Sequence, residues 1–196
     1  MNKKSFKIVF LLLLIACSFI SCDNEISIPK PSTHLMVDLP EHTYKPFEDS
    51  TNYSFQMSKL WSLRFNFKKQ DSLILYLGKQ IDGDLHFQYF KIDTLNTLAK
   101  LINQTFAKID FHKVKAQQMK DTTFILNNKR VFGTLYEYIG NSATNYQFYL
   151  TDSTNHFVRT ELLIRRVPNY DSLQPTLHYI RKDLVHLINS FEWKKQ

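Results

Sequence analysis

The sequence predicts an α+β fold, with a central and mainly antiparallel β-sheet on which two main helices pack. In several short segments apolar residues alternate with polar ones, and polar turns separate these segments, as in antiparallel strands. In two longer segments apolar residues recur every three or four positions, as on the buried face of a helix. The order of strands, helix, more strands and a final helix suits helices packed on one sheet.

The N terminus has the pattern of a lipoprotein signal. Lys3, Lys4 and Lys7 form a positive start, and they precede an apolar core at residues 8–15. This core is too short to span a bilayer, which needs about 20 residues. We therefore expect residues 1–21 to be a signal peptide that is removed. Its loss lowers the formal net charge from +7 to +4, because three lysines leave.

The chain has two cysteines, Cys17 and Cys22, and either could be the residue that a bacterial lipoprotein acylates. The residues before Cys17 fit the usual apolar-x-small-cysteine pattern better. Cleavage before Cys17 leaves the apolar Phe19 and Ile20 on the tether, however, and cleavage before the second cysteine gives a polar mature start. We choose Cys22 as the lipidation site. A disulfide is not expected, since signal removal leaves Cys22 without a partner thiol.

Residues 22–34 then form a lipidated N terminus and a flexible tether, and residues 35–196 form a single α+β domain. Pro29 and Pro31, with little apolar periodicity around them, favour an extended tether. The domain can fill a real core, because 43% of the chain is hydrophobic and 14% is aromatic. Basic residues occur as scattered pairs without an aromatic-interleaved stripe, so the sequence does not favour nucleic-acid binding.

The first part of the domain should contain a short strand, a loop and a hairpin. Alternation predicts a strand or edge segment over residues 35–39. The aromatic but aperiodic residues 44–55 suit a loop that covers one end of the core. Residues 61–67 and 73–77 alternate on either side of a polar turn, which predicts a hairpin.

Two segments have helical periodicity. Asp93 is placed to cap a first helix from Thr94 to about Lys108. Its expected buried stripe consists of Leu95, Leu98, Ile102, Phe106 and Ile109. The second helix follows Pro168, and Asp171 or Ser172 is placed to cap it. Its stripe recurs at steps of four and three and consists of Leu173, Leu177, Ile180, Leu184, Leu187 and Phe191.

Between the two helices the sequence predicts successive short antiparallel strands. Residues 114–119, 123–126 and 131–139 have the composition and length of such strands. Residues 146–150 and 158–164 alternate on either side of a polar break, which predicts a second hairpin. This hairpin leads directly into the last helix.

No catalytic or metal-binding arrangement stands out. Asp152, Ser153 and His156 have the residue types of a hydrolase triad, but they lie within one turn, whereas triad members converge from separate segments. His178 and His186 lie about 80° apart around the last helix, without a third ligand nearby. Glycine is too scarce for a phosphate loop. We therefore expect no enzyme, no metal and no cofactor.

A set of short motifs runs in order through nearly the whole mature chain. They are Cys22 with Pro29-Lys30-Pro31, His112 with Lys115-Ala116, Gly140-Asn141-Ser142-Ala143, Thr151-Asp152-Ser153 with His156-Phe157, Pro168-Asn169-Tyr170-Asp171-Ser172 with Pro175, and Trp193-Lys194. Together they resemble the GldD family of gliding-motility lipoproteins of the Bacteroidota. Arg159-Thr160 depart from the family pattern, which is expected to have a small residue there. The order of strands and helices also looks like the Mog1/PsbP fold, by topology alone.

The resemblance implies a lipoprotein that is needed for gliding and for the associated type IX secretion system. It implies work with other proteins of that machinery, namely a GldE-like membrane protein and other Gld lipoproteins. It also implies a lipid anchor in the cell envelope, with the domain in the periplasm or at the cell surface. The alternative is an envelope lipoprotein that binds a small molecule or lipid in a pocket lined by some of its many Phe and Tyr residues.

The tip of the second hairpin, at Asp152, Ser153 and His156, is the expected partner-binding site. The strand that follows it is about 33 Å long, so the tip and residues 169–171 at the other end cannot form one compact site. The latter have a role in capping the last helix. The tip has no comparable folding role, and surface loop residues that folding does not need are suited to partner contact.

Overall fold

The computed structural model describes residues 38–47, 51–67, 71–166 and 169–194. The expected signal peptide, Cys22 and the tether therefore lie outside the described residues. The elements are β1 (Tyr44–Phe47), β2 (Tyr53–Ser58), β3 (Ser62–Phe67), β4 (Ser72–Tyr76), β5 (Gly83–Lys91), α2 (Leu98–Lys113), β6 (Gln118–Leu126), a 3-10 turn (Asn127–Lys129), β7 (Val131–Ile139), β8 (Tyr146–Thr151), β9 (His156–Ile164), α3 (Tyr170–Ser190) and β10 (Glu192–Trp193).

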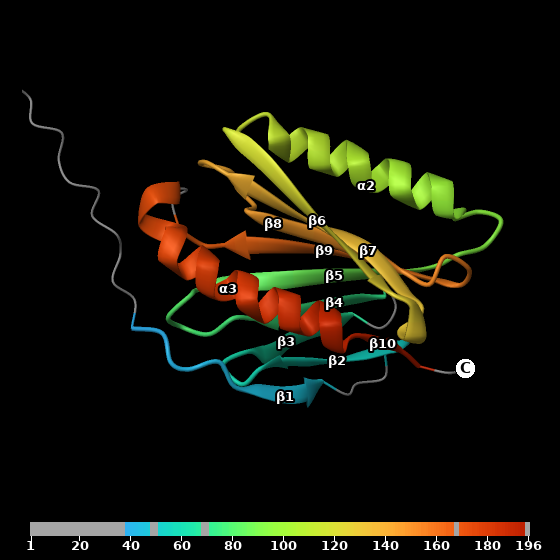
Figure 1. Cartoon of the computed structure of the whole chain (residues 1–196), viewed down its shortest axis with the longest axis horizontal. Helices are drawn as coiled ribbons and strands as arrows, with labels where there is room; N and C mark the ends of the chain where they lie inside the picture. The colour runs from blue at the N-terminus through green and yellow to red at the C-terminus, as the bar shows by residue number, and fades with distance from the viewer. Residues whose placement is uncertain (1–37, 48–50, 68–70, 167–168, 195–196) are drawn as a thin grey trace, which may run out of the picture. The chain divides into compact units, whose positions relative to one another are not determined.

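Seven strands form a large sheet in the order β3-β4-β5-β9-β8-β7-β6, and three form a small sheet in the order β1-β2-β10. All the strand pairs that the structure describes are antiparallel. Helices α2 and α3 lie on opposite faces of the large sheet, since Leu135 packs in the α3 core and its neighbour Tyr136 packs with α2 (Figure 1). The predicted α+β fold with a mainly antiparallel sheet and two helices is confirmed.

The main core lies between the large sheet, α3 and the small sheet. The predicted stripe of α3 is buried along its whole length, and Leu184 has no exposed surface. Aromatic rings from two strands meet this stripe: Tyr53 and Phe55 of β2 stack on Phe191 with ring centroids 5.2 and 6.2 Å apart, and Phe55 stacks on Phe87 of β5 at 5.5 Å. Each such buried side chain contributes about 1.5 to 3 kcal/mol to folding. The high aromatic content therefore serves the core.

The segment 44–55, expected as a loop, instead begins the small sheet with β1 and β2. Alternate residues of β2, namely Tyr53, Phe55 and Met57, are buried, which is the period of a strand. Pro46 is tolerated because β1 is an edge strand of this sheet. The strand expected over residues 35–39 is wrong for Asp38 and Leu39, which are not in a strand, and residues 35–37 lie outside the described part.

Helix α2 begins and faces differently from the prediction. Its N-cap is Thr97, whose side chain accepts the N–H of Lys100, while Asp93 instead accepts the N–H groups of the two residues Leu95 and Asn96 in the turn before the helix. The buried positions of α2 are Leu101, Thr105 and Ile109. Of the expected stripe, Leu95 is 76% exposed and Phe106 is 44% exposed. The predicted stripe is therefore wrong at these two positions, because several apolar residues of this segment face solvent.

The cap predicted for the last helix is also wrong. Asn169, not Asp171 or Ser172, is the N-cap of α3: its side-chain oxygen accepts the N–H of Ser172, and its carbonyl accepts the hydroxyl of Ser172. Asp171 lies exposed in the first turn, where a carboxylate suits the positive end of the helix. Asparagine is as good an N-cap as aspartate, so the sequence alone does not separate these candidates.

Among the remaining strands, the hairpin β3–β4, the strand β7 and the hairpin β8–β9 are confirmed. Two strands differ from the prediction. β5 is a central strand that the sequence analysis does not identify, although its odd positions are buried. β6 is one continuous strand of nine residues where two short ones are expected, because all its residues pair with β7 without a register shift.

Candidate functional site

The expected partner-binding residues lie in the turn that joins β8 to β9. Asp152 is buried, with 6% exposure, and one oxygen of its carboxylate accepts the backbone N–H groups of Thr154, Asn155 and His156 at 2.8–3.0 Å. The other oxygen accepts the hydroxyl of Thr154 at 3.0 Å. An aspartate that accepts neighbouring N–H groups replaces acceptors that the turn backbone lacks. Asp152 therefore holds the turn in one conformation.

His156 fixes the base of the same turn. Its Nδ1 lies 2.8 Å from the hydroxyl of Tyr89, and its ring stacks on Trp193 with centroids 5.1 Å apart. Burial, with the nearby carboxylates, raises the pKa of Tyr89 to about 12, so the phenol keeps its proton and can donate it to the ring nitrogen. The His156 ring contacts Tyr89 and Trp193, whereas the carboxylate of Asp152 accepts backbone N–H groups. The geometry is that of a packed turn and not of a hydrolase triad.

The expectation that this tip has no folding role is wrong, because Asp152 and His156 are both buried and hydrogen-bonded. The part that a partner could meet is Ser153, Thr154 and Asn155, which are exposed. Ser153 has a φ of 69°, in the left-handed region that serine seldom adopts, and its N–H binds the hydroxyl of Thr151 at 2.9 Å. The turn thus presents three polar side chains on a backbone that hydrogen bonds constrain.

Asp152→Ala should lower the free energy of unfolding by about 1 to 3 kcal/mol, because the N–H groups of Thr154, Asn155 and His156, the last of them buried, lose their acceptor. Asp152→Asn keeps one acceptor oxygen and should lose less. Urea unfolding of both proteins measures the difference. Ser153→Ala, at an exposed side chain of the same turn, is the control. A wild-type midpoint for Asp152→Ala would show that the turn does not depend on this carboxylate.

The same carboxylate should make stability depend on pH. Burial alone would raise the pKa of Asp152, but hydrogen bonds from the N–H groups of His156, Asn155 and Thr154 outweigh it and hold this pKa below its usual value. A lowered folded-state pKa means that the carboxylate stabilises the fold above the unfolded-state pKa, about 3.9. This contribution is lost as the pH falls through the lower, folded-state pKa. The difference in the free energy of unfolding between wild type and Asp152→Asn should therefore become smaller as the pH is lowered, as urea unfolding at a series of acidic pH values would measure.

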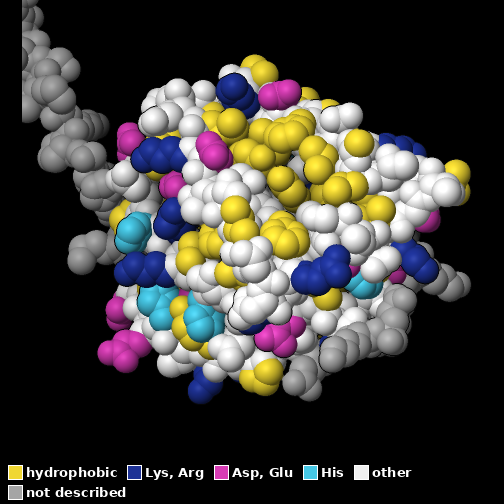
Figure 2. Space-filling model, turned by 45° about the vertical axis from the view of Figure 1, so that its right-hand side comes forward, with side chains coloured by type: hydrophobic (Ala, Val, Ile, Leu, Met, Phe, Trp, Pro, Cys, Tyr) yellow, Lys and Arg dark blue, Asp and Glu magenta, His cyan; other side chains and the backbone are white. Residues whose placement is uncertain are grey.

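A strip of apolar side chains lies on the α2 side of the large sheet, and we call it the apolar strip: Phe106, Ile125, Phe132 and Tyr149. Ile125 and Phe132 are partners across β6 and β7, and Tyr149 follows on β8. Phe106 comes from α2, and its ring centroid lies 6.5 Å from that of Tyr136, on the same face of β7. Ile125 is 64% exposed, Phe106 is 44% exposed, and the other two are partly exposed. Figure 2 shows hydrophobic side chains gathered on the upper part of one face, at the height of α2 and β6 in Figure 1.

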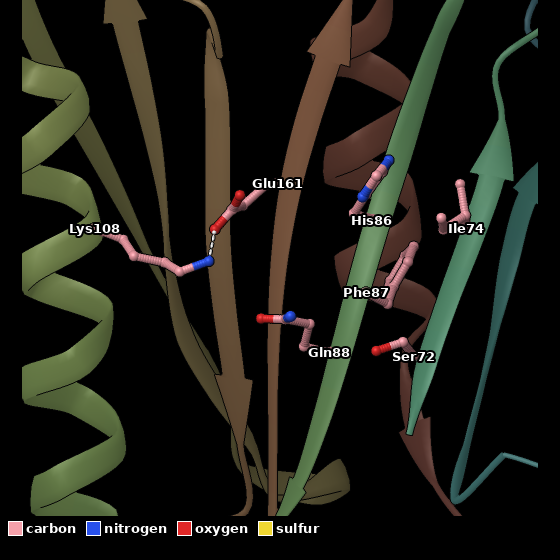
Figure 3. Close-up of a pocket in the computed structure, with 7 residues that line it drawn as sticks. All are labelled: Ser72, Ile74, His86, Phe87, Gln88, Lys108 and Glu161. Atoms are coloured by element: carbon pink, nitrogen blue, oxygen red, sulfur yellow. Dashed lines mark hydrogen bonds and ion pairs between the residues drawn. The ribbon is translucent and has the colours of Figure 1, made fainter. Parts of the chain in front are cut away.

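Part of the same sheet face, over β4 and β5, forms a shallow polar pocket of about 220 Å³ (Figure 3). Its lining residues are Ser72, Ile74, His86, Phe87, Gln88, Lys108 and Glu161. Lys108 reaches from α2 to Glu161 on β9, with Nζ and Oε1 2.8 Å apart. Arg159, which departs from the family pattern, is accommodated beside this pocket: it donates to Gln88 Oε1 at 2.7 Å and lies over the ring of Phe90. Two polar pairs, Lys108 with Glu161 and Arg159 with Gln88, therefore lie in or beside this pocket.

A third feature lies where α2 ends beside the β7–β8 turn. This pocket of about 200 Å³, the α2-end pocket, is lined by Phe111, His112, Val114, Lys115, Ser142 and Ala143. Phe111 and Val114 are 75% and 84% exposed. Ser142 is 4% exposed, and its hydroxyl has no hydrogen-bond partner among the described residues. Buried hydroxyls normally have a hydrogen-bond partner, and large apolar side chains are normally buried. The unpaired Ser142 hydroxyl and the exposed Phe111 and Val114 therefore make this pocket a candidate binding site.

Residues far apart in the chain build the α2-end pocket. A Cβ at Gly140, where φ is 124°, would lie 2.9 Å from the backbone nitrogen of Gln117, so glycine lets the β7–β8 turn approach the segment after α2. Asn141 accepts the N–H of Tyr170 at 2.8 Å and ties the turn to the start of α3. Burial lowers the pKa of His112 in this setting. Three of the sequence motifs, those at His112, Gly140 and Tyr170, therefore meet here, which sequence spacing alone does not reveal.

The described part of the chain offers neither a cluster of metal ligands nor a helix that could cross a membrane. Residues 38–47, 51–67, 71–166 and 169–194 contain no group of three His, Cys, Asp or Glu side chains that could hold a metal ion. None of the described helices is both long and apolar enough to cross a bilayer. The candidate sites are therefore the β8–β9 turn, the apolar strip and the pockets.

Comparison with known proteins gives a family match and likenesses to solved structures, among them two with TM-scores below 0.5. The model of the family described as gliding motility lipoprotein GldD matches residues 24–193. The curated proteins contain no match. The solution structure of cyanobacterial PsbP from Synechocystis is similar at 10% identity and a TM-score of 0.48, covering 80% of this chain and 95% of that one. A crystal structure from Bacteroides thetaiotaomicron is similar at 14% identity and a TM-score of 0.38, covering 78% and 49%.

The family match extends over nearly all of the chain after the expected signal. It includes every described strand and helix, from β1 to β10. It also includes the β8–β9 turn at one end of the large sheet and the α2-end pocket at the other, where the motifs of the sequence gather. The protein belongs to the GldD family of gliding motility lipoproteins.

Proposed function

We propose that the protein is a lipid-anchored, non-enzymatic component of the gliding machinery and the associated type IX secretion system, and that it acts by binding partner proteins in the cell envelope. Membership of the GldD family supports the gliding role. The observation that carries the binding role is the apolar strip close to the hydrogen-bonded β8–β9 turn. The expected partners are a GldE-like membrane protein and other Gld lipoproteins.

The strip and the turn together have the composition of a protein interface. Such interfaces combine an apolar, often aromatic centre with a polar rim. The strip offers three aromatic rings and Ile125, and the turn offers the exposed polar residues Ser153, Thr154 and Asn155. The two are adjacent, because Phe132 pairs with Thr151, the last residue of β8 before the turn. A partner that covered Ile125 would gain about 2 kcal/mol from that side chain.

Ile125→Lys should strongly impair gliding while the protein remains folded. The side chain is 64% exposed, so lysine costs the free protein little, but it places a charge at the centre of the proposed interface. Leu95→Lys, at a position 76% exposed and before α2, is the matched control. The measurements are gliding speed and secretion in complemented cells, with protein abundance and melting temperature. Equal gliding of the two variants would exclude the strip as the binding site.

A photo-crosslinking residue in place of Asn155 tests the turn itself. Asn155 is exposed at the tip, and its replacement leaves the carboxylate of Asp152 and the ring of His156 unchanged. In cells we expect a crosslink to a gliding or secretion protein that weakens in the Ile125→Lys background. A crosslinker at Gln174, exposed on α3, serves as the control. The same products from both positions would indicate nonspecific proximity.

Cys22, which lies outside the described residues, is the proposed lipid site. Metabolic labelling with an alkyne fatty acid should label wild type and Cys17→Ala, and it should fail with Cys22→Ala. Several acyl chains hold a protein stably at a bilayer, whereas one chain binds only marginally, so loss of acylation should release the protein from membranes. Labelling that persists in Cys22→Ala would assign the lipid to the other cysteine.

The alternative role, small-molecule binding in an aromatic-lined pocket, has less support. The core rings pack against one another, as Phe47 and Phe55 do with centroids 4.8 Å apart. Each of the two pockets described above is lined by a single phenylalanine and no tyrosine. Native mass spectrometry of the purified lipoprotein separates the two roles. A ligand bound to most molecules would favour the pocket.

A further inference from the structure

The described chain begins at the same end of the large sheet as the α2-end pocket. The carbonyl of Asp38 accepts a hydrogen bond from Gln80 in the β4–β5 turn, at 3.5 Å, and the carbonyl of Gln80 accepts one from Arg166 just after β9, at 3.0 Å. The β7–β8 turn lies at this end too, because the Thr144 hydroxyl donates to a carbonyl near the end of β9. We call this the anchor end, since the described chain begins here, at Asp38 (Figure 1).

The β8–β9 turn lies at the opposite end, about 30 Å away along the nine residues of β9. The chain positions of Cys22 and Asp38 differ by 16, and a fully extended chain of that length spans roughly 55 Å at most. A lipid anchor at Cys22 thus limits the distance between the bilayer and Asp38 to roughly 55 Å. The anchor end is the end of the domain at which this limit applies. The opposite end remains available to partner proteins.

Exposed apolar and basic side chains are combined at the end of α2. Phe111 and Val114 are the apolar pair, at 75% and 84% exposure, and Lys113 and Lys115 are exposed beside them. No acidic side chain is among the described residues that line the pocket. Segments that lie in a membrane interface use this combination, because apolar side chains enter the headgroup boundary while lysines stay near the phosphates.

Helix geometry alone does not account for this surface. Lys113 suits the negative end of the α2 dipole, so a lysine there has a structural reason. The same reason does not apply to Phe111 or Val114, which are exposed although the buried face of α2 is complete without them at Leu101, Thr105 and Ile109. Ser142 lines the pocket, and its buried hydroxyl has no partner among the described residues. This hydroxyl can donate a hydrogen bond to an oxygen of a lipid headgroup.

We propose that the α2-end pocket is a membrane-contact site, at which Phe111 and Val114 enter the interfacial region of an anionic lipid bilayer and Lys113 and Lys115 meet its phosphates. The site rests on the lipid anchor proposed above, and it is separate from the partner-binding strip. It gives the anchored domain a preferred orientation, with the β8–β9 turn directed away from the bilayer. The α2-end pocket is therefore a second, weaker membrane attachment, and it orients the domain that the lipid anchor holds at the bilayer.

Depth-dependent quenching in the acylated protein tests the orientation. In a Cys17→Ala background a cysteine introduced elsewhere is the only free thiol, because Cys22 is acylated. Val114→Cys, Ile125→Cys and Ser153→Cys each receive a bimane label, and the proteins are reconstituted in vesicles of phosphatidylcholine and phosphatidylglycerol. We expect lipid-borne doxyl quenchers to quench the label at position 114 several-fold more than the labels at 125 and 153. Equal quenching at 114 and 153 would overturn the proposal.

A second arm removes the anchor. The chain from residue 22 with Cys22→Ser retains every described residue, and its flotation with vesicles reports the site alone. Binding should be several-fold stronger to vesicles that contain phosphatidylglycerol than to phosphatidylcholine alone. Phe111→Ser with Val114→Ser should reduce it several-fold, whereas Leu95→Ser and Ile125→Ser, at other exposed apolar positions, should not. Melting temperatures confirm that the variants are folded. Equal loss in all variants would overturn the proposal.

A protein that covers the pocket gives a different result. The label at 114 would then be shielded from a water-soluble quencher in cell membranes, but lipid-borne quenchers would not reach it in vesicles, and this overturns membrane contact in favour of a protein site. If Cys22 is not acylated, the anchor proposal fails on the labelling experiment. The flotation of the unacylated chain still decides the membrane-contact site, so the two failures are distinguishable.

Discussion

Leu184→Ala should lower the free energy of unfolding by about 2 to 5 kcal/mol. Leu184 lies in the middle of α3, has no exposed surface and belongs to the cluster that joins this helix to the large sheet and to β2. Truncation leaves a cavity that close-packed neighbours fill only in part. The loss is a large share of the total stability of a typical domain, about 5 to 15 kcal/mol. Urea or thermal unfolding measures it.

The matched control is Leu95→Ala, the same chemical change at a side chain that is 76% exposed. It should alter the free energy of unfolding by no more than about 0.5 kcal/mol, because little apolar surface leaves the core. The comparison isolates burial, since both variants lose the same atoms. Similar unfolding midpoints for the two variants would show that the α3 stripe is not the core of the domain.

The two helices show when periodicity predicts a buried face and when it does not. In α3 nearly every apolar residue points into the core, so the spacing of Leu173 to Phe191 identifies the buried face correctly. In α2 the apolar residues lie on more than one face: Leu101 and Ile109 are buried, whereas Phe106 and Phe111 are exposed. Periodicity assumes that apolar means buried. The exposed phenylalanines of α2 violate that assumption.

Strand prediction fails for β2 and β5, although each pairs with the strand before it in the chain, β1 and β4. β2 takes its partner β10 from the far C terminus, where Glu192 pairs with Ser54. β10 has two residues, too few for any alternation to be recognised. The hairpins β3–β4 and β8–β9 are predicted because their partners are adjacent in sequence and a polar turn separates them. In the small sheet β1 and β2 pair locally, and only its third strand, β10, joins from a distant part of the chain.

The candidate sites also depend on contacts between residues that are far apart in the chain. The residue types at the β8–β9 turn indicate a turn, but the burial of His156 depends on Tyr89 and Trp193, which come from other strands. Asp183 is a further example: it lies on the buried face of α3, where a carboxylate is unexpected, and binds Nδ1 of His42 at 2.7 Å. A charged residue inside an apolar stripe is the available sequence signal. Its partner is visible only in the fold.

Gly133→Ala should destabilise the protein by at least about 3 kcal/mol, at or above the upper end of the usual cost of overpacking. A Cβ at Gly133 would overlap the carbonyl oxygen of Tyr149 on β8 and lie 2.9 Å from Cδ2 of Leu150. The overlap involves the backbone of β8, an inner strand of the large sheet, so a side-chain rotation cannot relieve it. Replacing glycine also restricts the unfolded chain, a gain of about 0.4 to 1 kcal/mol, which is too small to compensate.

Gly83→Ala is the control for this prediction, because it places the same methyl group in a strand of the same sheet. There a Cβ would lie 3.0 Å from the carbonyl oxygen of Leu163, a contact that a shift of a few tenths of an ångström relieves. We expect a markedly smaller loss of stability, measured by urea unfolding of both variants. A loss for Gly133→Ala no larger than that for Gly83→Ala would mean that β7 and β8 separate easily. The strands that position the β8–β9 turn and the apolar strip would then be less rigidly paired than their hydrogen-bonded register indicates.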